Sequence, residues 1–293
     1  MGQPPSGDKV DQSEQSVRRI AAAIRRRFKR LTLPWRMFPS FLVIGAQRSG
    51  TTSLYEFLVR HHQIRRAFEK EVHFFDKRFH KGLDWYRMQF PIALGNAPST
   101  TNRIITGEAT PYYLFHPLVA DRVQSVAPDI KIIVSLRNPI DRAYSHYHLE
   151  VRRGRETRNF EQAIDEERQL INGEDERIRQ VDQYASSDHQ NKSYLSRGHY
   201  AEQLSAWRSC FSEEQFCIVC AEEFYRQPDE VIGKIVRFLD LEPAEMPIST
   251  LKRYEKGSYN GLDERIRIAL AEHFSVHNCN LFELIGEEFR WEN

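Results

Sequence analysis

The sequence lacks a long apolar segment and contains few cysteines. No apolar run among its 293 residues approaches the ~18–20 residues that a membrane-spanning helix needs, and no signal-peptide core precedes Phe41. Four cysteines in a chain of this length give no disulfide framework. With 40% hydrophobic and 12% aromatic residues, the chain can instead bury one large core or two modest ones.

Two of the cysteines, Cys217 and Cys220, have the spacing of redox and zinc motifs. They lie in a segment, residues 215–221, whose composition predicts a strand. Residues three apart on a strand point to opposite faces, so we expect buried thiols rather than a redox pair or half a zinc site. No second cysteine or histidine pair at metal spacing completes a site, and we predict no metal.

The chain as a whole has almost no excess charge, but its N-terminal part is strongly basic. The net charge is +1, which argues against a protein that binds polyanions over its whole surface, and we expect no nucleic-acid partner. Between Gln15 and Tyr55 there is no acidic residue. The basic residues of this stretch are Arg18, Arg19, Arg25, Arg26, Arg27, Lys29, Arg30, Arg36 and Arg48.

Residues 1–37 are predicted to form a basic extension in front of the folded domain. Residues 1–16 are polar and expected to be disordered. Residues 17–31 are predicted to form a helix with one apolar stripe and an arginine-rich opposite face, which Pro34 and Pro39 end. The stripe consists of Val17, Ile20, Ile24, Phe28 and Leu31. Two interpretations stay open: the stripe docks on the domain or the helix stays mobile, which we favour, or the helix lies on an anionic membrane surface.

The most informative stretch is FLVIGAQRSGTT, residues 41–52. An apolar run ends at Gly45, four residues separate it from Gly50, and helix-type sequence follows. A buried strand, a tight turn and a helix N-terminus form the layout in which backbone N–H groups bind phosphate. The spacing is that of a Walker A loop, but Thr51 stands where that loop has its lysine. We therefore expect a phosphate-bearing ligand that is not handled as ATP.

A second segment repeats this layout downstream. Residues 131–136, KIIVSL, are predicted to form another buried strand, which ends at Arg137. The helix expected after it, residues 140–153, carries Ser145. A guanidinium at a strand end and a helical hydroxyl can surround one further phosphate.

The motifs VIGAQRSGTTSL and VSLRNPIDRAYSHY resemble those of the sulfotransferases that use 3′-phosphoadenosine-5′-phosphosulfate (PAPS). In that family the first motif holds the 5′-phosphosulfate and the second the 3′-phosphate. KEVHFFD, residues 70–76, is similar to the acidic-base motif of the branch that sulfates heparan-type glycans. KGSY, residues 256–259, is similar to a third donor-binding loop, and LFEL, residues 281–284, to the closing helix. The resemblance covers roughly residues 40–293.

The resemblance implies PAPS as donor, 3′,5′-adenosine bisphosphate (PAP) as product, no metal, and a set of site residues. The implied catalytic residues are Glu71 as general base, His73 in support, and Arg48, which stabilises charge on the departing bridging oxygen. The implied donor ligands are Arg48, Ser49, Gly50, Thr51, Thr52, Arg137, Ser145, Lys256, Gly257 and Ser258. Arg197 and Tyr200 lie where the family often has donor or acceptor contacts, and a helix-cap interpretation competes for them.

The choice of base stays open between two residues. Glu71 and His73 are two apart, so in an extended segment both point to the same face. One can take the acceptor proton while the other orients it. Relatives that act on small phenols and steroids use a histidine as base, so the two roles can be exchanged. Phe74 and Phe75 are expected to anchor the segment.

The acceptor is less defined than the donor. In the heparan-type branch a lysine follows the glutamate of a Glu-x-Thr-Pro motif, whereas this chain has Ala109 in that place. A polyanionic glycan is therefore in doubt, and a neutral saccharide, a glycolipid or a hydroxylated small metabolite is equally open, as is transfer to an amine. Two other functions stay possible. A P-loop kinase requires a lysine at position 51, and a non-catalytic binding protein predicts a damaged base or donor loop.

Helix-type and strand-type segments alternate after residue 38, which predicts an α/β fold with a P-loop-like parallel sheet covered by helices. We expect one domain, residues 38–293. The predicted strands are residues 41–44, 104–107, 131–136 and 215–220. The predicted helices are residues 53–60, 116–126, 140–153, 159–180, 198–211 and 229–239. Residues 71–75 are expected to be extended and residues 181–192 to form a polar loop.

The resemblance also suggests where the protein resides. Animal relatives that modify glycans are anchored in the Golgi membrane, and Met1 favours a complete, soluble protein of bacterial type in the cytoplasm. The oligomeric state is not predicted.

Overall fold

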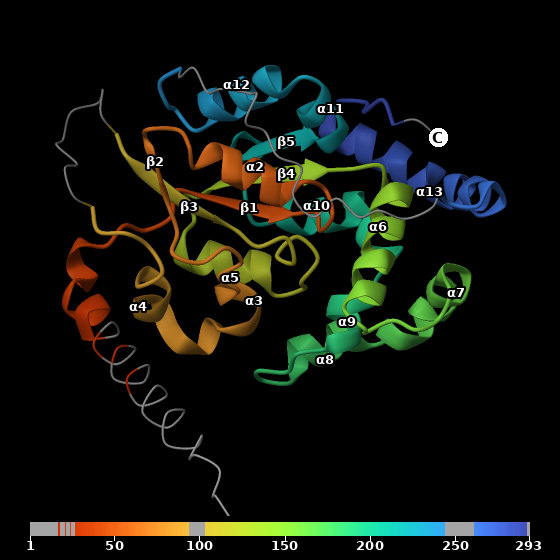
Figure 1. The fold of residues 1–293 in the computed structure, drawn as a ribbon, viewed down its shortest axis with the longest axis horizontal. Helices are drawn as coiled ribbons and strands as arrows, with labels where there is room; N and C mark the ends of the chain where they lie inside the picture. Colours follow the sequence, from red (N-terminus) through yellow and green to blue (C-terminus); the bar gives the residue numbers. More distant parts are fainter. Residues whose placement is uncertain are drawn as a thin grey trace, which may run out of the picture.

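The computed structural model describes residues 27–93, 103–243 and 261–291, together with Val17, Ala21 and Ile24. Among these residues, five strands form one parallel sheet in the order β2-β3-β1-β4-β5 (Figure 1). The strands are β1 (Phe41–Gly45), β2 (Ile64–Arg66), β3 (Ile105–Ala109), β4 (Lys131–Leu136) and β5 (Phe216–Cys220). The predicted α/β class and parallel sheet are therefore confirmed.

Helices cover both faces of the sheet (Figure 1). One face packs on α2 (Thr51–Leu58), α11 (Ala221–Arg226) and α12 (Pro228–Phe238). The other packs on α3 (Phe74–Lys77), α4 (Gly82–Arg87), α5 (Val119–Val126), α10 (Tyr200–Arg208) and α13 (Glu264–Ile285). A third apolar cluster joins α13 to α6 (Pro139–Arg152) and α7 (Phe160–Ile171). The remaining described α-helices are α8 (Glu174–Gln180) and α9 (Ser187–Asn191).

The central strand shows why the sequence reads as a continuous apolar run. In β1, Phe41 and Val43 pack into one core, and Leu42 and Ile44 into the core on the other face. A parallel strand buried on both faces has no polar positions to alternate with the apolar ones.

The same alternation separates the two cysteines of β5. Cys217 contributes to one core and Cys220 to the other, as predicted. Burial raises the pKa of Cys217 to about 11 and that of Cys220 to about 12, so both thiols stay protonated and unreactive at neutral pH.

Several segments differ from the prediction. β2, α4, α9 and α11 were not predicted, and the helix expected over residues 159–180 is divided at Gly173, which has a φ of 72°. Residues 71–75 are not extended: α3 begins at Phe74, and Glu71 and His73 have positive φ angles of 59° and 52°. The difference at residues 71–75 matters most. Glu71 and His73 were expected to point to the same face because they are two apart in an extended segment, and that argument does not apply to a left-handed backbone.

The described part of the N-terminal helix does not dock its apolar stripe. Val17, Ile24, Phe28 and Leu31 are each between 57% and 67% exposed. The helix end contacts the domain through Lys29 instead, whose ammonium lies 4.6 Å from the ring centroid of Phe68 and whose carbonyl accepts a hydrogen bond from Arg36. The docking half of the favoured interpretation is thus wrong for these four residues, while Ile20 lies outside the described residues. In the described residues, no helix combines the length and the apolar character needed to cross a membrane.

Candidate active site

A cavity of about 660 Å³ lies at the carboxyl edge of the sheet. Its walls come from segments that directly follow β1, β3, β4 and β5, where parallel sheets usually place ligand sites. The wall residues that were predicted for the donor or the chemistry are Arg48, Gly50, Thr51, Thr52, Glu71, His73, Arg137, Ser145 and Arg197.

The glycine loop after β1 is fixed to the neighbouring strand β4. The N–H of Ala46 donates to the carbonyl of Ser135 at 2.7 Å, and the hydroxyl of Ser135 donates to the carbonyl of Ser49 at 2.6 Å. Gly50 then caps α2 with a φ of 74°, a conformation that side chains disfavour, and a Cβ there would lie 3.0 Å from the hydroxyl of Tyr225. The N-terminus of α2 therefore opens into the cavity with Thr51 and Thr52 in its first turn.

The two predicted phosphate-binding segments meet in this cavity. The Nε of Arg48 donates a hydrogen bond of 3.0 Å to the hydroxyl of Ser145, which is 97 residues away in the sequence. Arg137 donates to the carbonyl of Arg48 at 3.3 Å. Two guanidinium groups, a helix N-terminus and a hydroxyl thus face one space, which suits a ligand with more than one anionic group.

Two predicted donor residues lie behind this wall rather than in it. Ser49 is buried, and its carbonyl accepts the hydrogen bond from Ser135. Tyr200 is buried as well, and its hydroxyl donates to the carbonyl of Arg137 at 2.8 Å. The structure therefore gives Tyr200 a contact that positions Arg137. Lys256, Gly257 and Ser258 lie outside the described residues.

Arg197 presents a buried guanidinium to the cavity. It donates to the hydroxyl of Ser193, to the side-chain oxygen of Gln47 and to the carbonyls of His189 and Gln190. It also lies 4.8 Å from the ring centroid of Tyr112. Burial lowers its pKa to about 10, so it keeps its positive charge at neutral pH. Because these four hydrogen bonds go to neutral oxygen atoms, the charge favours an anion in the cavity.

The predicted catalytic pair also lies in the cavity wall. Glu71 Oε2 is 3.5 Å from His73 Nε2, and Glu71 Oε1 accepts a hydrogen bond of 2.6 Å from Lys70. On the far side of the imidazole, His73 Nδ1 donates to Asp76 at 2.5 Å. His73 is therefore held between two carboxylates, and Glu71 between two cations.

These contacts set the charges of the pair. Burial disfavours ionised Glu71, but hydrogen bonds and charges from His73 and Lys70 outweigh it and lower the pKa to about 2. Burial also disfavours the imidazolium form of His73, but the hydrogen bonds to Asp76 and Glu71 outweigh it and raise the pKa to about 9. At neutral pH Glu71 is a carboxylate and His73 a cation.

A buried chain of hydrogen bonds holds the segment that carries Glu71 and His73. The hydroxyl of Tyr113 accepts the N–H of Phe74 at 2.9 Å and donates to Glu108 at 3.2 Å. Tyr86 and Thr110 also donate to this carboxylate, at 2.6 and 2.8 Å. Phe74 and Phe75 are fully buried, which is the predicted anchoring.

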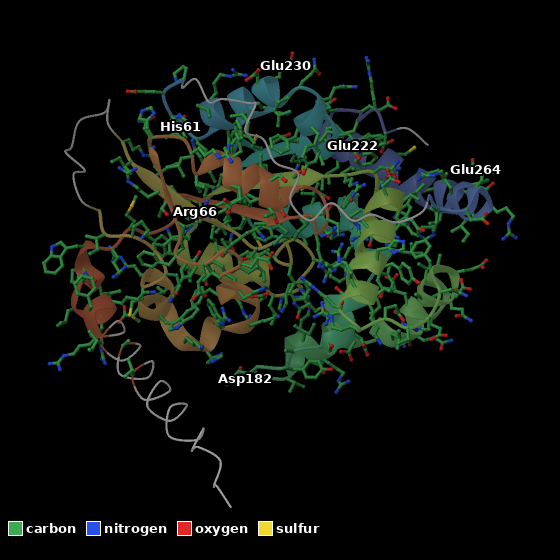
Figure 2. All side chains as sticks on the ribbon, viewed as in Figure 1. His61, Arg66, Asp182, Glu222, Glu230 and Glu264 are labelled. Atoms are coloured by element: carbon green, nitrogen blue, oxygen red, sulfur yellow. The ribbon has the colours of Figure 1, made fainter. Side chains whose placement is uncertain are left out.

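Sequence reasoning did not assign several residues of the site. Asp76 was seen within its motif but given no role, although its distance of three residues from His73 is the spacing of neighbours on a helical turn. Gln190 and Asn191 line the cavity from α9, the helix that was expected to be a loop. Glu222, labelled in Figure 2, lines it from the start of α11 and accepts the N–H of Asn138 at 3.0 Å.

Comparison with known proteins identifies the family to which this chain is similar. Residues 38–259 match the family described as "Sulfotransferase domain". The "Membrane-associated sulfotransferase kil1" of Dictyostelium discoideum is 25% identical over 320 residues, covering 87% of this chain and 67% of that protein. The human "Heparan sulfate glucosamine 3-O-sulfotransferase 6" is 27% identical over 278 residues, covering 87% of this chain and 74% of that protein.

One longer relative and one solved structure complete the comparison. The Drosophila melanogaster "Bifunctional heparan sulfate N-deacetylase/N-sulfotransferase" is 30% identical over 284 residues, and this chain spans only 26% of its length. The crystal structure of a sulfotransferase from Alicyclobacillus acidocaldarius is 29% identical, covers 86% of this chain and 97% of its own, and has a TM-score of 0.66. The fold described above is therefore a sulfotransferase fold.

Proposed function

This chain belongs to the sulfotransferase domain family, and on that premise we propose that it transfers a sulfonate group from PAPS to a hydroxyl group of a saccharide acceptor. The observation that carries the proposal is the meeting of two cationic segments, around Arg48 and Arg137, in one cavity that also holds a carboxylate–imidazolium pair. Family membership makes the chain an enzyme of the sulfotransferase class. The donor, the base and the acceptor are the proposal.

PAPS suits the charges of the cavity. We assign its 5′-phosphosulfate to the N-terminus of α2 and Arg48, and its 3′-phosphate to Arg137 and Ser145. The hydrogen bond between Arg48 and Ser145 supports this assignment, because it brings together one residue proposed for each phosphate of a single nucleotide. Arg197 adds a third cation to the same wall.

We assign the general base to Glu71. An imidazolium cannot accept a proton, and contacts with Asp76 and Glu71 keep His73 in that form at neutral pH. The Glu71 carboxylate takes the hydroxyl proton as the acceptor oxygen bonds to sulfur and the bond from sulfur to the bridging oxygen breaks. Since sulfuryl transfer is expected to be loose, the acceptor oxygen loses its proton late, and a weak base suffices. PAP leaves with the electron pair of that bond, and Arg48 stabilises the charge.

A saccharide acceptor is proposed from the relatives, two of which are named for heparan sulfate. A neutral saccharide or glycolipid is favoured over a polyanion, because Ala109 is buried and brings no cation to the reaction centre. Of the other two cavity arginines near α6, Arg155 is already paired with the buried Glu150 at 2.5 and 2.9 Å, and Arg153 lies 3.6 Å from the same carboxylate.

Peripheral membrane contact and cytoplasmic location are also part of the proposal. The exposed apolar stripe and the arginines of residues 17–31 are the composition of a helix that lies on an anionic membrane. One relative is named as membrane-associated.

The proposal is tested by incubating the protein with PAPS and a panel of neutral saccharides, glycolipids, heparan-type glycans, amines and phenols, and by measuring product masses. We expect a gain of one sulfonate on a neutral saccharide or glycolipid and none in the Glu71→Gln variant. Sulfonation confined to phenols would contradict the proposed saccharide acceptor, and phosphorylation of an acceptor with ATP would contradict the proposed sulfonate transfer.

A further inference from the structure

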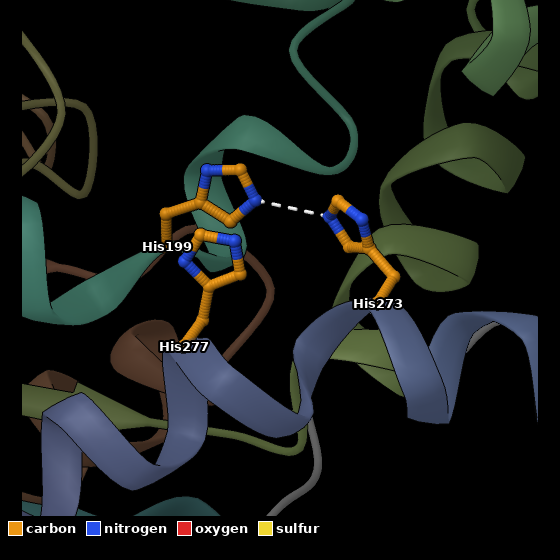
Figure 3. A group of neighbouring side chains, drawn as sticks. All are labelled: His199, His273 and His277. Carbon is orange, nitrogen blue, oxygen red and sulfur yellow. Dashed lines mark hydrogen bonds between the residues drawn. The ribbon is translucent and has the colours of Figure 1, made fainter.

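Three histidines meet outside the cavity, in a place that the proposed function does not use. His199 immediately precedes α10, and His273 and His277 lie one turn apart on α13 (Figure 3). None of the three lines the cavity. The sequence analysis missed them: it stated that no histidine pair has metal spacing, but His273 and His277 are four apart on a helix, so they share one face.

The distances between the rings are close to those of a metal centre. His199 Nε2 and His273 Nε2 are 3.1 Å apart, and one ring nitrogen from each of the three histidines lies within 4.8 Å of the others (Figure 3). Zinc bound tetrahedrally at about 2.0–2.1 Å holds its ligand nitrogens about 3.3 Å from one another. His199 and His273 are therefore already spaced for one ion.

The third ring needs a small adjustment. The ring of His277 stacks on that of His199, with centroids 3.8 Å apart and an interplanar angle of 8°. The nitrogen lone pairs of two stacked rings lie in parallel planes and do not point at one ion. The side chain of His277 therefore has to rotate and move its ring nitrogen by about 1–1.5 Å to bind the same ion as His199 and His273. Its surroundings allow this rotation, since the residue is only partly buried.

The surroundings supply two further features of a metal site. Glu202 Oε1 lies 3.5 Å from His277 Nδ1, where it can orient the imidazole and leave Nε2 for the ion. His273 is exposed, which gives an ion and a water molecule access.

We propose that His199, His273 and His277 bind one Zn²⁺ ion, with water as the fourth ligand. Imidazole nitrogen suits zinc and its neighbours in the transition series, whereas magnesium and calcium prefer oxygen. An imidazole–imidazole hydrogen bond alone accounts for the 3.1 Å contact of His199 with His273, but not for a ring nitrogen of a third histidine within 4.8 Å of both. The ion would link the start of α10 to α13, and α13 follows residues 244–260, which include the predicted third donor loop. Zinc therefore acts as a structural brace between two helices and takes no part in sulfonate transfer.

Calorimetric titration of the full chain with ZnCl₂, after chelator treatment and dialysis, tests the site. We expect one bound ion in the wild type, and binding at least about tenfold weaker in His273→Ala and in His277→Ala, equivalent to about 1.4 kcal/mol. The matched control is His80→Ala, an exposed histidine far from α13 in the sequence, which should bind zinc as the wild type does. No binding in the wild type, or unchanged binding in both α13 variants, would overturn the proposal.

Two further measurements test the site in case an alanine variant fails to fold. Co²⁺ added to the wild type should give the intense visible bands of a four- or five-coordinate nitrogen site, and only the weak bands of the hydrated ion would contradict the site. Zn²⁺ should raise the melting temperature of the wild type and of His80→Ala but not that of His273→Ala. An equal rise in all three would place the ion elsewhere.

Discussion

At the scale of single residues, the proposed chemistry depends on the charges that surround Glu71. Lys70 contacts one of its carboxylate oxygens and His73 the other, and Asp76 keeps His73 protonated. In the proposed reaction, the acceptor hydroxyl therefore meets a carboxylate whose charge and orientation are set before it binds.

Replacement of Glu71 by glutamine keeps the shape of the side chain but removes its basicity. We expect turnover to fall by about 10²–10⁴-fold, the usual contribution of a positioned base. PAP affinity should hardly change, because Glu71 is assigned to the acceptor. Steady-state sulfonation and calorimetry with PAP measure the two quantities. His73→Ala is the companion variant and should lower turnover less than Glu71→Gln does. An inactive His73→Ala together with an active Glu71→Gln would mean that His73 is the base and Glu71 the supporting residue.

The protonated His73 makes stability depend on pH in a defined direction. Its folded-state pKa of about 9 lies above the ordinary imidazole value of about 6.5, so the folded protein holds an extra proton between these pH values. The stabilisation is fully present below about pH 6.5 and is lost as the pH rises through about 9.

Comparison with His73→Gln isolates this effect, because glutamine does not titrate. The free energy of unfolding in urea should differ most between the two proteins near pH 6, and the difference should shrink towards about pH 9.5. A difference that stays constant over this range would show that His73 is not held as a cation.

At the scale of elements, the proposed donor site is assembled from segments that follow strand ends. The sequence was enough to predict that Gly45, Gly50 and Arg137 lie in one phosphate-binding site. Each follows or ends a buried strand, and the carboxyl ends of parallel strands meet at one edge of the sheet. Glu71 and His73 were paired correctly for the wrong reason, since their side chains meet through left-handed backbone rather than through strand alternation.

Other parts of the site depend on contacts that no local pattern contains. α9 is a short, polar segment whose helix is stabilised by the cap of Ser186 on the N–H of His189, so propensity alone does not separate it from a loop. Tyr200 was predicted as a donor ligand because of its place in a motif, yet its hydroxyl is directed at the carbonyl of Arg137. Packing between distant elements decides such orientations.

Two separate cationic segments imply that the 3′-phosphate matters for affinity. PAP should bind at least about tenfold more tightly than AMP, because the loss of that phosphate leaves Arg137 without its anionic partner. Calorimetric titration with both nucleotides measures the ratio. Arg137→Ala should lower the affinity for PAP much more than that for AMP, and equal affinities in the wild type would contradict the assignment of the second segment.

The N-terminal helix predicts binding to anionic vesicles. Co-sedimentation should be stronger with vesicles that contain phosphatidylserine than with neutral ones, and should weaken at high salt. Phe28→Asp should reduce it, because Phe28 is an exposed member of the stripe. A matched control is Val181→Asp, which changes an exposed apolar residue outside the helix. Equal loss in both variants would show that the stripe has no special role.

At the scale of the whole molecule, we predict that the proposed reaction needs no metal in its active site. The cations of the cavity are side chains, and a sulfonate carries less charge to neutralise than a γ-phosphate. Sulfonate transfer should therefore survive EDTA, measured as the initial rate before and after chelation. Abolition of activity by EDTA, with rescue by magnesium, would favour the kinase alternative.

The order of the strands also constrains how the protein acquires its function during synthesis. β1 emerges from the ribosome before both of its sheet neighbours, β3 and β4, and the contact between Arg48 and Ser145 closes a loop of 97 residues. Such long-range parallel pairing is intrinsically slow to form. A nascent chain that ends before β4 therefore has half of the proposed nucleotide site and an unpaired edge of its central strand. The proposed donor PAPS can favour the native chain only after translation has passed β4 and the start of α6.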